Sequence, residues 1–297
     1  MGEMIPLYGF GGKSGRSFAT LTITAPVGAT VTVSKDGKSK PSKVAATGTV
    51  VFKGLEAGTW TITIAKGTDT AEKKVEIKAD YQAEITFFSA TINITYPAGL
   101  VCTVTNGSTT LNAPDTSGTW DCVVTEAGEW TVNLSTGFAE KVTVGASGES
   151  HTVNKWYVYK DGDQRTELTG GWESAKYGNP IFTFDDTKVI INTQSADNKP
   201  GGKVFTKNAC NLTGFSILKA AVTMVKPYNA AVGIIEAGIS TQKITSANTS
   251  GEAKATTKTT GTISANLSSV TSGLAEVYPY FKVNSAIGEL QQMWLEV

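Results

Sequence analysis

The stretches ATLTITAPVG (19–28) and ATINITYPAG (90–99) match position by position, 71 residues apart. A longer pair follows them, because TGTVVFKGLEAGTWTITI (47–64) corresponds to SGTWDCVVTEAGEWTVNL (117–134) at an offset of 70 residues. The small change in offset is typical of a duplicated domain whose surface turns have lost or gained single residues. Self-similarity at a fixed spacing therefore predicts two copies of one module between residues 19 and 154.

Within each copy, apolar and polar residues alternate, which is the pattern of a strand buried on one face. Turn sequences such as Lys35-Asp36-Gly37 and Asn106-Gly107 separate the alternating runs. About seven short strands per copy follow, and they predict a small β-sandwich. The expected inward residues of the two copies are Leu21, Ile23, Trp60, Ile62 and Ile64, and Ile92, Ile94, Trp130, Val132 and Leu134. Trp60 and Trp130 are expected to anchor the cores beneath a turn.

The repeat ends before Lys155, and the remaining 143 residues have a different residue pattern. Apolar runs such as FTFDDTKVIIN (182–192), SILKAAVTMV (216–225) and AEVYPYFKV (275–283) predict strands. WYVYKDGDQRTELTGGW (156–172) predicts two strands joined by a turn at Asp161–Asp163, and 241–260 reads as an exposed hairpin or loop. One jelly-roll sandwich whose last strand pairs back into a sheet fits this block.

Four parts are therefore expected in an all-β chain: an arm at 1–18, sandwich repeats at 19–88 and 89–154, and a jelly-roll domain at 155–297. The arm is too rich in glycine to hold regular structure alone. It is either a disordered terminus or a docking arm that becomes ordered on a partner. The apolar residues that would dock are Ile5, Leu7, Tyr8 and Phe10.

Charge and hydropathy exclude several classes of partner. The 26 basic and 26 acidic residues give a net charge of zero, whereas nucleic-acid binding requires clustered positive charge. No apolar run reaches the length of a membrane span, and the first residues lack the features of a secretory signal. No nucleic-acid or membrane partner is therefore predicted.

The sequence contains few residues that could form a catalytic site, a metal site or a cofactor site. The single histidine, His151, reads as a linker residue, and three cysteines are too few for a metal site or a disulfide framework. Asp185 and Asp186 are adjacent, so on a strand they would point to opposite faces and not form a pair. Asp161 and Asp163 are interpreted as part of a plain hairpin turn, with two calcium ligands as the alternative. Cys102 and Cys122 replace core residues, as buried thiols or as a disulfide. We expect no enzyme, no metal and no cofactor.

Exposed aromatic rings beside amides are the candidate ligand contacts, because sugar recognition uses flat rings and planar polar groups. Trp156 and Trp294 lie in alternating strands and are expected in the core. The sequences KYGNP and KPYN are turn-rich, so their rings should be accessible. The predicted ligand-binding residues are Tyr177, Asn179, Tyr228 and Asn229.

The chain also resembles known families. The EAG-x-W turns and Pro-x-Gly openings of 19–154 resemble PEGA-like and immunoglobulin-like modules of bacterial surface proteins and phage structural proteins. The arrangement of 156–172, CNLTGFSILK (210–219) and the N-terminal IPLYGFGG (5–12) resembles virion proteins of phages of Gram-positive bacteria, whose terminal domain is similar to galactose-binding-like modules.

This resemblance implies a tail, baseplate or head-fibre protein located in the virion. The arm would dock on other virion proteins, the protein would be a homo-oligomer, and the last domain would bind a host-surface glycan. Three alternatives stay open: a purely structural capsid decoration or head-fibre protein, a bacterial surface adhesin or carbohydrate-binding fragment, and a glycan-cleaving enzyme. An enzyme would need two carboxylates roughly 5–10 Å apart. Met1 and the closing strand favour a complete product over a fragment.

Overall fold

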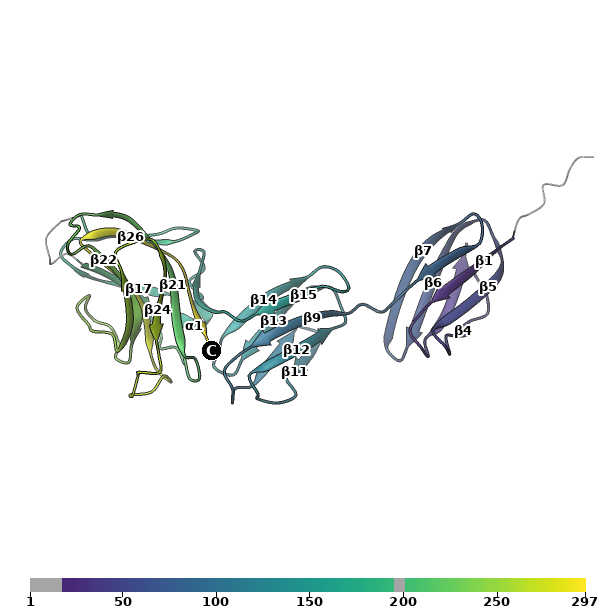
Figure 1. Ribbon diagram of the computed structural model, residues 1–297, viewed down its shortest axis with the longest axis horizontal. Helices are drawn as coiled ribbons and strands as arrows, with labels where there is room; N and C mark the ends of the chain where they lie inside the picture. Colours follow the sequence, from purple (N-terminus) through teal and green to yellow (C-terminus); the bar gives the residue numbers. More distant parts are fainter. Residues whose placement is uncertain (1–17, 195–200) are drawn as a thin grey trace, which may run out of the picture. The chain divides into compact units, whose positions relative to one another are not determined.

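The computed structural model describes residues 18–194 and 201–297 (Figure 1). The chain divides into two compact units, Met1–Phe88 and Ser89–Val297. The described residues form strands and one helix of four residues, so the expected all-β sandwich class is confirmed. The proposed docking residues Ile5, Leu7, Tyr8 and Phe10 lie outside the described residues.

The first unit is a two-sheet sandwich. One sheet has the order β5-β1-β8, and the other has the order β3-β2-β6-β7 with β4 paired to β2. Its last strand runs parallel to its first, whereas the other pairings are antiparallel. The strands are β1 (Phe18–Thr24), β2 (Thr30–Lys35), β3 (Lys38–Ser39), β4 (Lys43–Val44), β5 (Thr49–Glu56), β6 (Gly58–Lys66), β7 (Asp69–Ile77) and β8 (Tyr81–Glu84).

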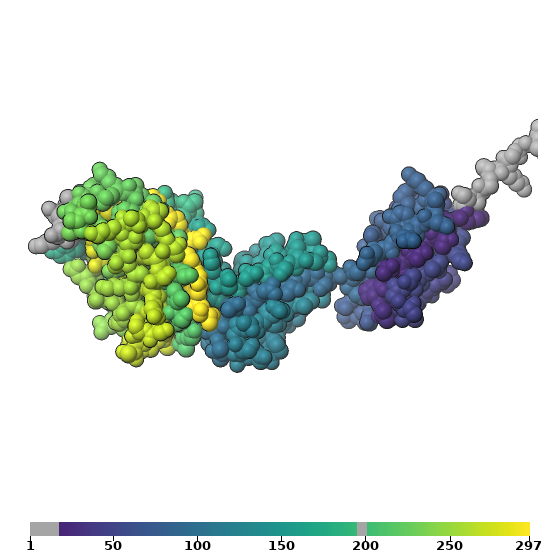
Figure 2. All heavy atoms as spheres, in the orientation of Figure 1, coloured from purple at the N-terminus to yellow at the C-terminus, as the bar shows by residue number. Residues whose placement is uncertain are grey.

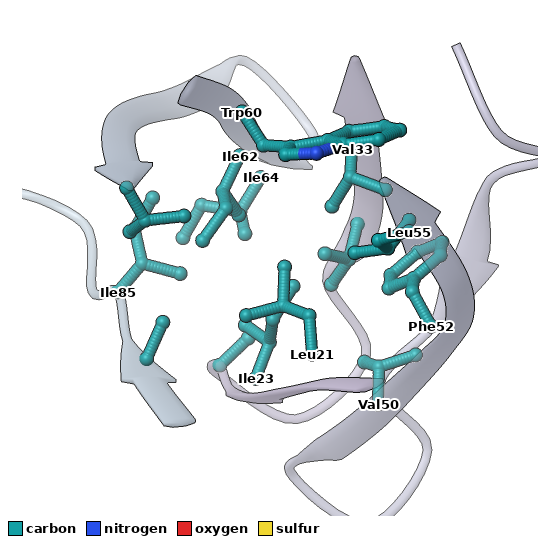
Figure 3. Close-up of a cluster of buried hydrophobic side chains, with 14 of the residues drawn as sticks. Leu21, Ile23, Val33, Val50, Phe52, Leu55, Trp60, Ile62, Ile64 and Ile85 are labelled. Atoms are coloured by element: carbon teal, nitrogen blue, oxygen red, sulfur yellow. The ribbon is translucent and has the colours of Figure 1, made fainter. Parts of the chain in front are cut away.

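The core of this repeat contains the five residues that alternation predicted, together with others. Leu21, Ile23, Ile62 and Ile64 have no exposed surface, and Trp60 keeps 6%. The Trp60 ring lies at one end of the cluster next to Val33 (Figure 3). Its indole N–H donates to the carbonyl of Glu56 at 2.9 Å, so the one polar atom of the ring is satisfied inside the core. Trp60 is therefore a core anchor, as expected.

The second repeat has the same architecture, with sheets β12-β9-β15 and β11-β10-β13-β14. Again the last strand, β15, runs parallel to the first, β9. Trp130 repeats the role of Trp60, since it is 1% exposed and its indole N–H donates to Glu126 O at 3.1 Å. The strands are β9 (Ala90–Thr95), β10 (Cys102–Thr105), β11 (Thr110–Asn112), β12 (Thr119–Val124), β13 (Gly128–Leu134), β14 (Ala139–Val144) and β15 (Ser150–Val153).

The cysteines of the second repeat are buried free thiols. Cys102 lies on β10 and Cys122 on β12, and neither is oxidised. Burial raises the pKa of Cys102 to about 12 and that of Cys122 to about 11. Both thiols therefore behave as small apolar core residues at neutral pH.

The C-terminal part is a larger sandwich of two antiparallel sheets. One has the order β18-β19-β26-β21-β24, with β16 also paired to β26, and the other has the order β17-β20-β25-β22-β23. The chain passes repeatedly from one sheet to the other, as in jelly-roll sandwiches. The strands are β16 (Trp156–Lys160), β17 (Trp172–Tyr177), β18 (Ile181–Phe184), β19 (Val189–Asn192), β20 (Gly201–Thr206), β21 (Ile217–Pro227), β22 (Ile234–Ser240), β23 (Ala253–Thr257), β24 (Gly261–Asn266), β25 (Tyr278–Asn284) and β26 (Ala286–Glu296).

Two local expectations are corrected by the structure. The segment after the turn at Asp161–Asp163 forms the single-turn helix α1 (Thr166–Thr169) instead of a second strand. His151 lies in β15, opposite Ile92, and its Nε2 lies 3.1 Å from Glu149 Oε2. It is thus a strand residue of the second repeat and not a linker.

The segment 241–252 is the largely exposed loop of the β22–β23 hairpin, as expected, but two of its side chains pack onto the sheet. Ile244 and Ala247 are buried, and Ile244 packs with Phe205 and Tyr280. Beneath the segment lies Lys203, whose side chain has no exposed surface. Its ammonium donates to the carbonyl of Thr249 at 2.5 Å and lies 3.9 Å from the centre of the Tyr280 ring. Because the segment 241–252 covers its outer face, β20 is buried on both faces.

Candidate functional site

The strand register brings the predicted ligand residues to one end of the C-terminal sandwich. Tyr177 ends β17 opposite Gly201, and Gly201 pairs in turn with Asn284. In the facing sheet, Pro227 at the end of β21 pairs with Ala286, directly before Tyr228. The loops 178–180 and 228–233 therefore leave the sandwich at the same end, which we call the distal end.

Tyr177 is the most accessible of these aromatic side chains. It is 41% exposed, and its partner directly across the strands is Gly201, which has no side chain. Asn179 follows it in an exposed loop whose turn is made by Gly178 at φ +84°. Among the described residues, the Asn179 side chain makes no hydrogen bond. Tyr177 and Asn179 thus offer an open ring and an open amide within three positions of the chain.

Tyr228 is held more firmly. Its hydroxyl donates to Asn192 Oδ1 at 2.8 Å, and its backbone N–H donates to Ser285 O at 2.9 Å. The ammonium of Lys226 lies 5.3 Å from the centre of its ring. The ring is half-buried, so it is less accessible than the ring of Tyr177.

Asn229 shapes the loop that carries Tyr228. Its side-chain carbonyl accepts the N–H of Ala231 at 2.9 Å, and its backbone carbonyl accepts the N–H of Gly233 at 2.6 Å. These bonds are typical of an Asx turn. Asn229 is therefore a positioning residue for the distal end, whereas Tyr177 and Asn179 are the exposed groups.

Sequence reasoning missed Asn192 and Lys226 at this end. Asn192 ends β19, and besides Tyr228 it accepts the N–H of Gln194 at 3.0 Å. Lys226 is the first residue of the KPYN turn, so its place near the Tyr228 ring follows from chain proximity. For Asn192 no local signal existed, because 36 residues separate it from the hydroxyl that it binds.

Two of the carboxylates considered for catalysis or metal binding, Asp185 and Asp161, accept hydrogen bonds from neighbouring groups of the sandwich. Asp185 Oδ1 accepts the N–H groups of Thr187 and Lys188, each at 2.8 Å, and these bonds lower its pKa, those from Thr187 most. Both oxygens of Asp161 lie 3.0 Å from the amide nitrogen of Gln292. Across the described ranges, no three His, Cys, Asp or Glu side chains gather as a potential metal site.

The opposite end of the sandwich is joined to the second repeat, and Figure 2 shows the teal repeat packed against it. Trp156 is fully buried, and its indole N–H donates to Thr95 O of the repeat at 3.0 Å. Phe138 of the repeat meets Phe215 edge-to-face, with ring centres 5.3 Å apart. β26 runs from the distal end to this junction, so the two ends are separated by roughly 30 Å of strand.

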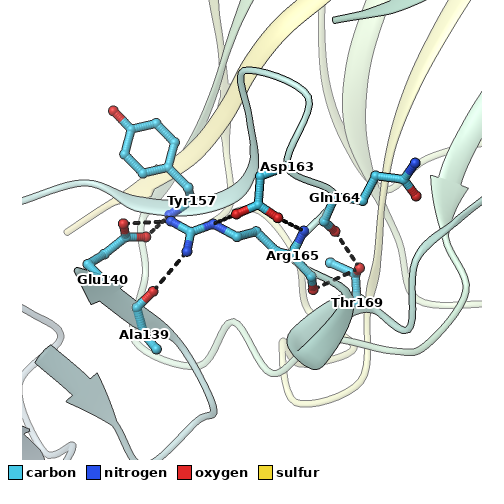
Figure 4. Close-up of polar contacts among 7 residues, drawn as sticks. All are labelled: Ala139, Glu140, Tyr157, Asp163, Gln164, Arg165 and Thr169. Carbon is cyan, nitrogen blue, oxygen red and sulfur yellow. Dashed lines mark hydrogen bonds and ion pairs between the residues drawn. The ribbon is translucent and has the colours of Figure 1, made fainter. Parts of the chain in front are cut away.

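A buried ion pair completes the junction (Figure 4). Arg165 Nη2 donates to Glu140 Oε2 at 2.6 Å, and the other oxygen of Glu140 accepts the N–H of Tyr157 at 2.9 Å. Arg165 also donates to Ala139 O, and its Nε lies 3.5 Å from Asp163 Oδ2. Burial raises the pKa of Glu140, which is 6% exposed, and the Arg165 guanidinium opposes that rise.

A cavity of about 350 Å³ opens beside this ion pair. Cationic side chains, carboxylates and one aromatic ring line this cavity. They come from both the second repeat and the C-terminal sandwich. The lining residues include Ala139, Lys141, Tyr157, Asp163, Arg165 and Glu167. Arg165 adopts a left-handed conformation at φ +49°, which costs energy for a residue with a Cβ, so the surrounding contacts hold this backbone in place.

Comparison with known proteins finds remote structural likenesses only. No family model and no curated protein matches the chain. A solved structure of the Bacillus anthracis TIE protein is 11% identical, with 93% of this chain and 48% of that chain covered and a TM-score of 0.22. This chain therefore spans about half the length of that protein.

Two further structures carry carbohydrate-related descriptions. One, described as carbohydrate-binding modules of the β-sandwich superfamily, is 10% identical over 81% of this chain and 93% of that chain, with a TM-score of 0.32. A putative carbohydrate-binding protein from Bacteroides uniformis is 9% identical over 70% and 99%, with a TM-score of 0.18. Likenesses this remote carry no argument about function. In the described residues, no helix is long and apolar enough to cross a membrane.

Proposed function

We propose that this protein is a non-enzymatic display protein of a phage virion, in which the C-terminal sandwich binds a host-surface glycan at its distal end. The observation that carries the proposal is the strand register, which gathers Tyr177, Asn179 and Tyr228 at the end opposite the junction. An open ring beside an open amide suits a pyranose, whose apolar face stacks and whose hydroxyls accept and donate hydrogen bonds.

The remaining parts have roles that fit display. The repeats act as spacers, and the arm with Ile5, Leu7, Tyr8 and Phe10 docks on other virion proteins. The virion then holds many copies, and weak glycan contacts gain avidity because the second and later contacts become intramolecular. A capsid decoration or head-fibre role without glycan binding is the alternative.

Tyr177→Ala is expected to weaken glycan binding about tenfold with little change in stability, because the ring is exposed and the residue directly opposite it is a glycine. The measurement is binding of the full chain, displayed as a multivalent streptavidin complex, to an array of bacterial cell-wall glycans. Tyr81→Ala is a matched control, since Tyr81 of the first repeat is also 41% exposed.

Saturable binding that falls in Tyr177→Ala and persists in Tyr81→Ala supports the proposal. Tyr228→Phe should reduce binding less, because it removes only the hydroxyl that holds Asn192. If the multivalent wild-type chain binds no glycan, the glycan proposal fails and the decoration role takes its place.

A further inference from the structure

The open edge of the first repeat carries a row of lysines. β5 is the outer strand of its sheet, so its outward carbonyls lack a strand partner. The register of β5 against β1 shifts opposite Ala19–Leu21, where Gly54 has φ +67°, so the strand pairing is irregular there. Three lysines from the facing sheet edge donate to these carbonyls. The bonds are Lys35 Nζ to Ala57 O at 2.5 Å, Lys40 Nζ to Gly54 O at 3.2 Å and Lys43 Nζ to Val51 O at 2.6 Å.

The lysine row carries an excess of positive charge, because the linings of the two cavities beside it contain five lysines and two carboxylates. Together with the exposed Lys38 and Lys53, the three lysines line two surface cavities of about 450 and 440 Å³ that share Lys40. Asp36 and Glu56 stand at the rim of the first cavity. Within the described part of the chain, none of the five lysines is ion-paired with a carboxylate. Each carbonyl-bound ammonium fixes its position with one N–H and keeps two for a ligand.

The second repeat shows that the sandwich does not require this row. It has the same strand order, yet residues 102–127 contain no lysine or arginine, whereas residues 31–57 contain all five lysines. In place of Lys35 it has Asn106, whose amide donates to Glu126 at 3.2 Å. Over the whole repeats, residues 18–88 carry nine lysines and seven acidic residues, and residues 89–154 carry one lysine and six. The duplicated modules have thus diverged in charge at the same edge.

We infer that the lysine row, Lys35, Lys38, Lys40, Lys43 and Lys53, binds a linear polymer of phosphodiesters. The bound carbonyls follow one another at three-residue steps, with Val51 and Gly54 on β5 and Ala57 directly after it. Each step spans at most about 10 Å of extended chain, so the ammonium groups form a line that an extended chain of anions can follow. Lysine binds phosphate as a point charge, and the released counterions favour binding.

The lysine row is suited to recognise the negative charge of phosphates and not the bases of a nucleic acid. The linings of the two cavities contain no arginine, and of their aromatic rings Trp60 and Phe52 are buried while Phe18 is exposed. The row therefore offers few groups that pair with base edges or stack on bases. A polyol phosphate therefore fits better than a nucleic acid. The inference is independent of the glycan proposal, since it concerns another unit of the chain.

The test is binding of the full chain to a defined poly(glycerol phosphate) at salt concentrations between about 50 and 200 mM. In the triple variant Lys35→Gln, Lys40→Gln and Lys43→Gln, affinity should fall at least tenfold at low salt. The slope of log K against log salt should decrease by about 2, at roughly 0.7 per lost cation. The corresponding Lys→Arg triple variant should retain binding.

The control is the triple variant Lys66→Gln, Lys73→Gln and Lys74→Gln, which removes the same charge elsewhere in the repeat. Lys66 and Lys73 also donate to backbone carbonyls, at 3.1 and 2.9 Å, so the control loses bonds of the same kind. The inference is overturned if both variants weaken binding equally, if the wild-type chain does not bind, or if single-stranded DNA of equal charge binds more tightly. If the Lys35, Lys40 and Lys43 variant has a lower melting temperature but keeps the wild-type salt slope, the lysines only stabilise the open edge of the sandwich and do not bind the polymer.

Discussion

Arg165→Ala should lower the free energy of unfolding of residues 89–297 by about 3 kcal/mol. Removing one partner of a buried pair leaves the other charge uncompensated, and such losses are typically 3–5 kcal/mol. Glu140 would keep only the N–H of Tyr157 as a partner in place of two donors. The readout is urea unfolding of the full chain together with hydrogen exchange of β14 and β16, the strands on either side of the junction.

Two controls separate the buried pair from a general charge effect. Replacing Arg165 by Met and Glu140 by Leu together should cost much less than Arg165→Ala, because no unpaired charge remains. Glu129→Ala breaks the exposed pair with Lys141, whose side chains are 57% and 67% exposed, and should leave the unfolding curve unchanged. If Arg165→Ala also leaves it unchanged, the junction depends on Trp156 and the Phe138–Phe215 contact instead.

The free energy of unfolding should also rise with pH between about 8 and 10.4 because of Lys203. Burial lowers the pKa of Lys203 to about 8, and the neighbouring Lys282 and Lys254 add to this, while Glu236 and Glu252 oppose it. In the unfolded chain the pKa returns to about 10.4. Between these values the unfolded state holds a proton that the folded state has released, so raising the pH favours the folded state. The gain, absent below pH 8 and complete above 10.4, is about 3 kcal/mol.

The difference between the wild-type chain and Lys203→Met isolates this contribution from other titrating groups. The wild-type chain should gain stability relative to the variant as pH rises from about 7.5 to 10.5, in denaturant unfolding at each pH. Lys176→Met, at an exposed position of the same sheet, should show a constant difference. A constant difference for Lys203→Met as well would mean that Lys203 is hydrated beneath the segment 241–252.

Much of the fold could be predicted because strand burial is a local, period-two property. Leu21, Ile62, Ile92 and Val132 were expected inward from alternation and have no exposed surface. Trp60 and Trp130 were expected as anchors, and both make the same indole-to-carbonyl bond four residues back. The exposure of Tyr177 followed from its turn-rich surroundings.

Other features had no local signal. β20 begins with two glycines and contains Lys203, so it lacks the alternation of a strand; it is buried because a distant segment covers it. The parallel pairing of β15 with β9 joins residues about 60 positions apart. Likewise Tyr228 was recognised as a loop aromatic, but its partner Asn192 belongs to another strand.

From the sequence follow the all-β class, the duplication and the inward residues, because each depends on residue types a few positions apart. The tertiary structure decided which segments meet. It joined the second repeat to the last sandwich through Trp156 and the Glu140–Arg165 pair, gathered Tyr177 and Tyr228 at one end, and aligned the lysines along β5. These contacts depend on register and on packing between distant strands, and the energies that select them are absent from any short stretch of the chain.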